Sequence, residues 1–239
     1  MKKSNIILLI TFGLAFTWTL IVGGLGAAAI NSFRQGHNST YVFTSDEHSQ
    51  VVIRPSSAPI KELRITGDRS VLIILKTGPE FTVDCMRHDK NYITVINQDG
   101  IATIRVEKLP TQGAQMQVTI PELVKVSVDS VFELVINGIA QNNLSVQCRQ
   151  SQVVDINGCK IRRLTLDFPD KLQKNNVMIN ESNRFDSLSV SMAGYGTLRL
   201  GCMAKSQNLM QVSPKVEIHT RQEIYKHLTF HSNLPVRPK

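Results

Sequence analysis

Short runs of alternating apolar and polar residues recur along the chain from Val51 onward. Alternation of period two places the apolar side chains on one face of a strand, and Gly, Pro, Asn and Asp residues between the runs suit turns. No amphipathic helical stretch of useful length separates the runs. The pattern therefore predicts an all-β fold, with strands in its first half near residues 51–53, 63–65, 71–75, 81–83, 92–96, 101–106 and 116–120.

The second half contains an internal repeat with an offset of twenty residues. Ile136-Asn137-Gly138 recurs as Ile156-Asn157-Gly158, and each motif is followed eight residues later by an apolar-polar-apolar triplet, at 144–146 and 164–166. A looser third copy begins at Ile179-Asn180-Glu181 and continues at 188–190. A short β repeat of this kind is typical of a solenoid, in which each coil buries its apolar face against its neighbours. We therefore expect a β-helix-like solenoid of short repeated strands.

A chain of antiparallel hairpins is the alternative, because Asn-Gly is also a common hairpin turn. One strand pairing is enough to distinguish the two folds. A solenoid places Leu144 beside Leu164 in parallel register, whereas a meander pairs 153–156 antiparallel to 144–148.

The repeat also assigns a role to Cys148. Leu144, Val146 and Cys148 align with Leu164, Leu166 and Phe168, so Cys148 falls in an apolar column. We expect a small buried core residue at this position rather than a nucleophile or a metal ligand.

An export segment precedes the strands. Met1-Lys2-Lys3 is followed by an uncharged, largely apolar run from Ile6 to Ile30. A run of about 25 residues reaches across a bilayer and favours an uncleaved anchor, whereas the apolar part of a cleavable signal is usually about 7–15 residues. The small residues up to Ala29 leave cleavage open. The two lysines place the N-terminus in the cytoplasm and the remainder on the far side of the membrane.

Composition and charge add limits rather than a function. The 239 residues carry a formal net charge of +8, which favours anionic partners without choosing among them. Export and the scattering of Lys and Arg argue against nucleic acid. The four cysteines, Cys85, Cys148, Cys159 and Cys202, would lie in an oxidising compartment, where spacing alone does not pair them.

No motif predicts catalysis, a cofactor or a metal. In the repeat register the carboxylates do not stack: Asp155 aligns with Val135, and Asp167 with Gln147, whereas glycoside hydrolysis usually needs a carboxylate pair. The best metal candidate is the pair His227 and His231, with His219 nearby, but the surroundings indicate a strand or a tail. We therefore expect no enzyme, and no catalytic, cofactor-binding or metal-ligating residues.

The layout resembles a family of bacterial envelope proteins described as putative auto-transporter adhesins with a head GIN domain. The resemblance rests on the export segment, the strand run, the phrase at 118–123 (Val-Thr-Ile-Pro-Glu-Leu) and Val126-Ser127-Val128 leading into short repeats. Asn137-Gly138 and Asn157-Gly158 stand where the family often has Gly-Ser-Gly-like turns. The resemblance implies a β-helix-like extracytoplasmic domain and supplies no catalytic residues.

The resulting domain plan has four parts: a signal anchor or signal peptide at 1–30, a tether at 31–40, a β-helix-like head GIN-type domain at 41–221 and a basic tail at 222–239. We expect a cell-envelope protein, either single-pass in the inner membrane with a periplasmic domain or exported after cleavage. Its expected role is adhesion or scaffolding through an envelope protein or polysaccharide, with self-assembly open. The alternative is a carbohydrate-active enzyme on a β-helix.

Overall fold

The structure, a computed structural model, describes residues 48–52, 59–67, 69–107 and 114–231. The chain divides into two compact units, 1–44 and 45–239, and every described residue lies in the second. The predicted export segment with Ala29, the tether and residues 232–239 of the predicted tail lie outside the described residues. Across the part of the chain that is described, no helix has the length and apolar character needed to span a membrane.

The described residues form strands almost throughout, which confirms the all-β prediction and each strand predicted in the first half. Two short helical segments are present, η1 (Lys90–Tyr92) and α2 (Gln222–Tyr225). The strands are β1 (His48–Val52), β2 (Glu62–Thr66), β3 (Leu72–Thr77), β4 (Thr82–Met86), β5 (Ile93–Gln98), β6 (Ile101–Val106), β7 (Gln115–Ile120), β8 (Lys125–Asp129), β9 (Glu133–Asn137), β10 (Ala140–Arg149), β11 (Val153–Asn157), β12 (Lys160–Phe168), β13 (Lys174–Ile179), β14 (Arg184–Met192), β15 (Tyr195–Leu200), β16 (Gln207–Val212), β17 (Val216–Thr220) and β18 (Thr229–Phe230).

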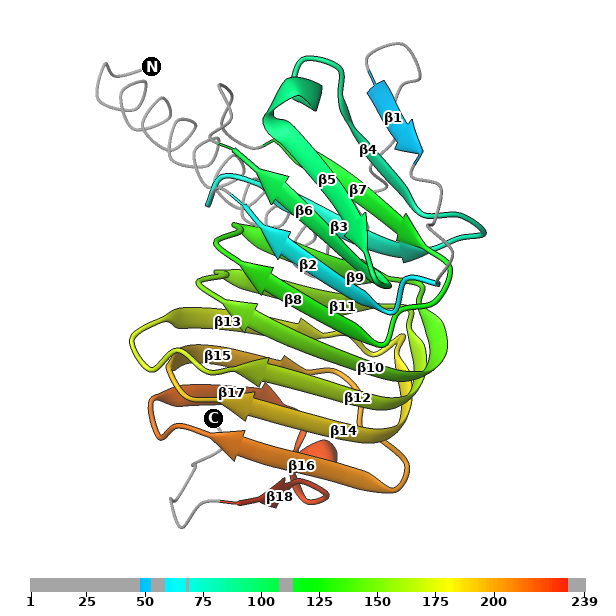
Figure 1. The fold of residues 1–239 in the computed structure, drawn as a ribbon. Coiled ribbons are helices and arrows are strands. Elements are labelled where there is room, and N and C mark those ends of the chain that lie inside the picture. Colours follow the sequence, from blue (N-terminus) through cyan, green and yellow to red (C-terminus); the bar gives the residue numbers. More distant parts are fainter. Residues whose placement is uncertain (1–47, 53–58, 68, 108–113, 232–239) are drawn as a thin grey trace, which may run out of the picture. The chain divides into compact units, whose positions relative to one another are not determined.

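Two nine-stranded sheets contain all of these strands (Figure 1). Sheet A has the order β1-β4-β7-β3-β9-β11-β13-β15-β17, and sheet B has the order β18-β16-β14-β12-β10-β8-β2-β6-β5. From β8 onward the chain alternates between the sheets, so one strand of sheet B and the following strand of sheet A make one coil. Each coil adds a parallel strand to both sheets.

The strand register agrees with the repeat. Leu144 pairs with Leu164, and Leu164 with Leu188, all in parallel strands. The Asn-Gly motifs also coincide, since Asn137 pairs with Asn157 in sheet A. The parallel prediction is thus confirmed, and the hairpin alternative is wrong for β8 to β16, because β11 pairs with β9 and β13 rather than with β10.

The Asn-Gly motifs are corners between coils. Gly138 and Gly158 have φ angles of 66° and 61°, in the left-handed region that glycine adopts without steric cost. The buried Asn183, at the equivalent corner of the next coil, supports the corner at Asn157-Gly158. The Asn183 side-chain oxygen accepts a hydrogen bond from the Cys159 N–H at 2.9 Å, and its amide group donates to the Ile156 carbonyl at 2.7 Å. Polar backbone groups at this corner are therefore satisfied inside the protein.

The first seven strands are ordered differently from the coils that follow. The coil made by β2 and β3 lies between the one made by β6 and β7 and the one made by β8 and β9, so chain order and spatial order differ. Outside it, β4 pairs antiparallel to β7 and β1, and β5 pairs antiparallel to β6. The link from β7 to β8 passes the intervening coil and inserts Leu123 into the core at 1% exposure.

The core fills the space between the two sheets. Inward residues alternate with polar ones along each strand, as in β10, where Leu144, Val146 and Cys148 are buried. At the end formed by the last strands, Ile224 of α2 joins the core, and Leu228 and Phe230 pack against it. Residues 222–231, within the stretch predicted as a basic tail, therefore contain α2 and the last strand of sheet B.

Candidate functional site

The four cysteines are buried or partly buried. Cys148 is 1% exposed in the core, which confirms the prediction from the repeat. Burial, together with the negative charge of Asp167, raises the pKa of the Cys148 thiol to about 12, so the reactive thiolate is scarce at neutral pH. All four cysteines are present as thiols, and burial raises the pKa of Cys202, the half-buried one, to about 11.

The histidines weighed as metal ligands do not form a cluster. His219 lies on β17 with its Nε2 3.4 Å from Glu217 Oε2. His227 lies in the turn after α2, where its N–H donates to the Ile224 carbonyl, and His231 follows β18. Among the described residues, no group of three or more His, Cys, Asp or Glu side chains is placed to hold a metal ion.

The outer face of sheet B is polar and carries a surface hollow. Serine and threonine side chains stand in register on neighbouring strands, with Ser145 beside Thr165 and Thr165 beside Ser189. Parallel strands about 4.8 Å apart turn this register into a row of hydroxyl groups. The row lies beside a groove that runs across β2, β8 and β10.

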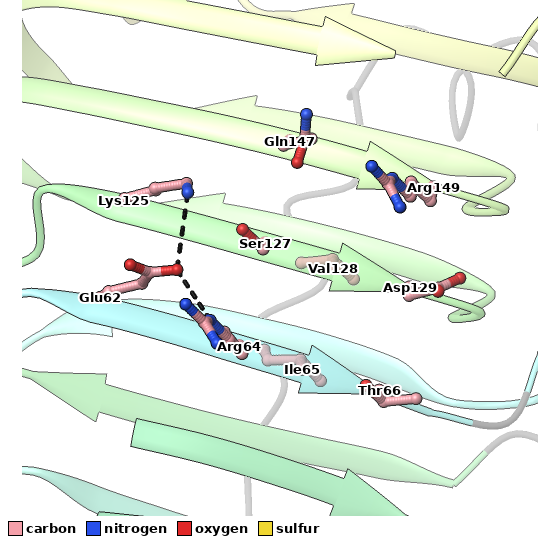
Figure 2. Close-up of a pocket in the computed structure, with 10 residues that line it drawn as sticks. All are labelled: Glu62, Arg64, Ile65, Thr66, Lys125, Ser127, Val128, Asp129, Gln147 and Arg149. Atoms are coloured by element: carbon pink, nitrogen blue, oxygen red, sulfur yellow. Dashed lines mark hydrogen bonds and ion pairs between the residues drawn. The ribbon is translucent and has the colours of Figure 1, made fainter. Parts of the chain in front are cut away.

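This groove has a volume of about 300 Å³ and is open to solvent (Figure 2). It exists because residues at alternate positions of three adjacent parallel strands point outward together. Ten residues line it: Glu62, Arg64, Ile65, Thr66, Lys125, Ser127, Val128, Asp129, Gln147 and Arg149. Three of them are cations and two are carboxylates, so charged and hydrogen-bonding groups dominate its lining.

Glu62 interacts with two of the cations in the groove. Arg64 Nε donates to Glu62 Oε1 at 2.8 Å, and Lys125 Nζ lies 3.5 Å from the same oxygen, as the dashed lines in Figure 2 mark. The hydrogen bond from Arg64 is the main cause that lowers the pKa of Glu62, with partial burial opposing it and Lys125 assisting. Glu62 is therefore ionised at neutral pH and neutralises only part of the charge of its two partners.

The other end of the groove is arranged around Arg149. Its strand neighbour is Asp129, which accepts a hydrogen bond from Ser130 Oγ at 3.0 Å. Within the described part of the chain, no carboxylate lies within 4.0 Å of the Arg149 guanidinium. The guanidinium group, which can donate several hydrogen bonds, is therefore not neutralised by an ion pair there.

The two carboxylates of the groove are poorly placed to act as a catalytic pair. Glu62 is in register with Lys125, and Asp129 with Thr66, which puts them four residues apart along neighbouring strands. At about 3.3 Å per residue their backbones are about 13 Å apart. Glycosidases hold their two carboxyl groups about 5–9.5 Å apart. Figure 2 shows the two side chains at opposite ends of the groove.

A second hollow, of about 220 Å³, lies where β10 and β12 begin. Asn142, Asn143, Arg162 and Arg163 line it. The strand register advances from Gln141–Ile161 to Asn143–Arg163, so residues 142 and 162 are outside the ladder and two successive residues face outward on each strand. This bend brings the guanidinium groups of Arg162 and Arg163 to the same hollow.

Sequence reasoning missed both hollows. It treated Arg149, Lys160, Arg162 and Arg163 as scattered, because they are spread over turns and outward positions of the chain. The repeat register was a usable signal for part of the second hollow, since it aligns Asn143 with Arg163. No local signal brings Glu62 and Arg64 beside Lys125, because the pairing of β2 with β8 spans more than sixty residues.

Comparisons with solved structures find several chains at low identity. The structure described as a "putative adhesin" from Bacteroides fragilis NCTC 9343 is 14% identical, with a TM-score of 0.43, covering 74% of this chain and 86% of that one. A "putative adhesin" from Parabacteroides merdae ATCC 43184 is 9% identical, with a TM-score of 0.32, covering 83% and 94%. A "putative lipid binding protein" from Parabacteroides distasonis ATCC 8503 is 10% identical, with a TM-score of 0.32, covering 74% and 90%.

Likenesses at these scores do not define the fold or the function of this chain. No curated protein sequence matches it. The family model described as "Putative auto-transporter adhesin, head GIN domain" matches residues 61–231. The match extends from the strand that opens the polar groove to the last strand of sheet B, and the chain belongs to this family of head GIN domain, auto-transporter adhesin-like proteins.

Proposed function

We propose that this protein is a non-enzymatic component of the cell envelope whose β-helix-like solenoid makes adhesive or scaffolding contacts with a polysaccharide or another envelope protein. The contact surface is the outer face of sheet B. Membership of an adhesin-like family supports this role. The N-terminal apolar run supports placement in the envelope, either as an inner-membrane anchor with a periplasmic domain or as an exported protein after cleavage.

One observation carries the proposal: an open, polar groove adjoins a row of hydroxyl groups on parallel strands of sheet B. Hydroxyl, amide and guanidinium groups form hydrogen bonds with sugar hydroxyls and with polar protein surfaces, directly or through water. Rows of outward side chains repeated along a stack create the extended surfaces that repeat proteins use for binding. A shallow, open surface of this kind suits a long partner better than a small substrate.

The alternative of a carbohydrate-active enzyme has little to support it. The groove carboxylates are too widely spaced along the strands for acid and nucleophile roles. Asp167 accepts a hydrogen bond from Gln147, and Asp186 forms ion pairs with Arg162 and Lys205. Glu62 is held in an ion pair, and a general acid would instead need a raised pKa.

Retention assays with three versions of the full-length protein test this function. The groove variant carries Arg64→Gln, Lys125→Gln and Arg149→Gln. The matched control carries Lys171→Gln, Lys174→Gln and Lys215→Gln, which remove the same charge from exposed positions just before or at the start of strands of sheet A. We expect the wild type and the control to retain an envelope polysaccharide or protein, and the groove variant to lose most of it.

Two results would contradict the proposal. The first is that the wild type retains no envelope component and remains monomeric by light scattering, since adhesion and scaffolding both require a partner. The second is that the groove variant binds as well as the control, which would remove the groove from the contact. Circular dichroism of all three proteins checks that the substitutions leave the fold intact.

A further inference from the structure

A ridge of positive charge, distinct from the groove, lies where three neighbouring strands of sheet B begin. It is continuous in space although its members are spread along the chain. Lys160 is in register with Arg184 in parallel strands, and the Lys205 N–H donates to the Phe185 carbonyl at 3.0 Å, which adds the next coil. The basic ridge consists of Lys160, Arg162, Arg163, Arg184 and Lys205.

The fold leaves most of this charge uncompensated. Asp186 is the carboxylate that pairs with the ridge, with Oδ2 3.4 Å from Arg162 Nε and Oδ1 3.6 Å from Lys205 Nζ. Of the residues that the structure describes, no carboxylate lies within 4.0 Å of the other three cations, Lys160, Arg163 and Arg184. The nearby Glu181 pairs instead with Arg221 at 2.7 Å. The five cations and Asp186 together therefore give this surface a net charge of +4.

This arrangement is unfavourable for the isolated protein. Lys160 and Arg184 are directly opposite each other on adjacent strands, where like charges destabilise the sheet. All five side chains are exposed, so solvent and salt screen the repulsion without removing it. An anionic partner that spans several strands would relieve the repulsion and gain charge-assisted hydrogen bonds at the same time.

The geometry of the ridge points to a polymer with acidic groups. At its start, the 220 Å³ hollow presents two guanidinium groups and two side-chain amides, from Arg162, Arg163, Asn142 and Asn143. Guanidinium groups bind carboxylate or sulfate oxygens in pairs, and amides bind hydroxyl groups. From there the cations step from strand to strand along the stack, about 4.8 Å at a time. Ser187 and Gln207 continue the line of Arg163 as further neutral hydrogen-bonding groups.

We infer that the basic ridge binds an acidic polysaccharide, with acidic groups on the arginine and lysine side chains and sugar hydroxyls on the amides between them. This inference rests on the proposed function and narrows its partner to one chemical class. A polysaccharide fits better than a lipid surface because the hollow is lined by polar side chains alone. Attraction by exposed charges also predicts binding that weakens as salt rises.

Direct binding of polygalacturonate, a carboxylated polysaccharide, to the full-length protein tests the inference. The ridge variant carries Lys160→Gln, Arg163→Gln and Arg184→Gln, the three unpaired cations. The control is the Lys171→Gln, Lys174→Gln, Lys215→Gln variant, which has the same net charge. We expect the ridge variant to lose about tenfold or more in affinity and the control less than about threefold, and we expect the wild-type affinity to fall as NaCl is raised.

Other probes distinguish the ways in which the inference can fail. Equal losses in the ridge and control variants would show attraction to net charge, and binding unaffected by either variant would exclude the ridge. Binding to vesicles of phosphatidylglycerol without binding to polygalacturonate would assign the ridge to a membrane. Retention of a neutral polysaccharide or a protein through the groove, without polygalacturonate, would overturn the ridge assignment and leave the proposed function standing.

Discussion

The regular coils from β8 to β18 and the mixed end from β1 to β7 bury similar cores by different routes. In the regular coils each strand pairs with one about a coil away in sequence, as Leu144 does with Leu164. In the mixed end, Leu63 pairs with Val126, and Ile73 with Leu134. Local pairings lose little chain entropy on closing, whereas the mixed end forms only after long loops have closed. Equal burial therefore does not imply equal ease of folding.

The largest expected effect comes from core truncation on both sides of this comparison. Leu164 is 1% exposed in the coils, and Leu63 is 0% exposed in the mixed end. Replacing either by alanine leaves a cavity and should cost about 2–5 kcal/mol of unfolding free energy. Thr165→Ala, at an outward position, should cost less than about 0.5 kcal/mol. Urea denaturation of the three variants measures these values, and a cost for Leu63→Ala well below that for Leu164→Ala would show that the mixed end unfolds separately.

A smaller effect is expected at the junction of the two regions. Gln141 in β10 holds the crossover that leads into β8: its amide group donates to the Leu123 carbonyl, and its oxygen accepts from the Leu123 N–H at 3.4 Å. Gln141→Leu leaves both backbone groups without this partner and should cost about 1–3 kcal/mol. Gln207→Leu, at an exposed position, is the matched control. Equal stability of the two variants in urea would mean that the crossover is held by Leu123 burial alone.

A still smaller, pH-dependent effect is expected where Glu62 of the mixed end meets Lys125 of the coils. The pKa of Glu62 is lowered in the folded protein from its usual 4.5, mainly by Arg64. The stabilisation is therefore present above pH 4.5 and is lost as the pH falls through the folded pKa. Glu62→Gln should reduce stability by less than about 1 kcal/mol at pH 7, and the difference from wild type should vanish in acid. In an Arg64→Gln background the pH-dependent difference should shrink, and an unchanged difference would exclude this pair as its cause.

Thiol labelling should compare the two regions without changing stability. Burial raises the pKa of Cys85 in the mixed end to about 11, and that of Cys148 in the coils to about 12. At pH 8 the half-buried Cys202 should react first, and Cys148 only as fast as the protein unfolds globally. Mass spectrometry after timed labelling gives the order. Cys85 reacting ahead of Cys148 would show local opening of the mixed end, and equal rates would show one cooperative unit.

Local patterns were sufficient for much of the fold because its contacts are repeated between neighbours. Alternation predicted the strands, and the Asn-Gly motifs predicted the register, since a coil corner needs the left-handed conformation that Gly138 and Gly158 adopt. The apolar column predicted the burial of Cys148. The support that Asn183 gives to a corner was missed, because a single asparagine after a strand is ordinary in sequence and its three hydrogen bonds come from folding.

The sequence by itself therefore determined the all-β fold class, the parallel register of the repeats and the family. All three depend on residues close together in the chain. Only the tertiary structure decided that the coil of β2 and β3 lies between two later coils, which brings Glu62 beside Lys125. It also decided that Lys160 and Arg184 form one basic surface. The physical reason is that outward side chains take no part in the core, so no hydrophobic pattern records which of them become neighbours when the strands stack.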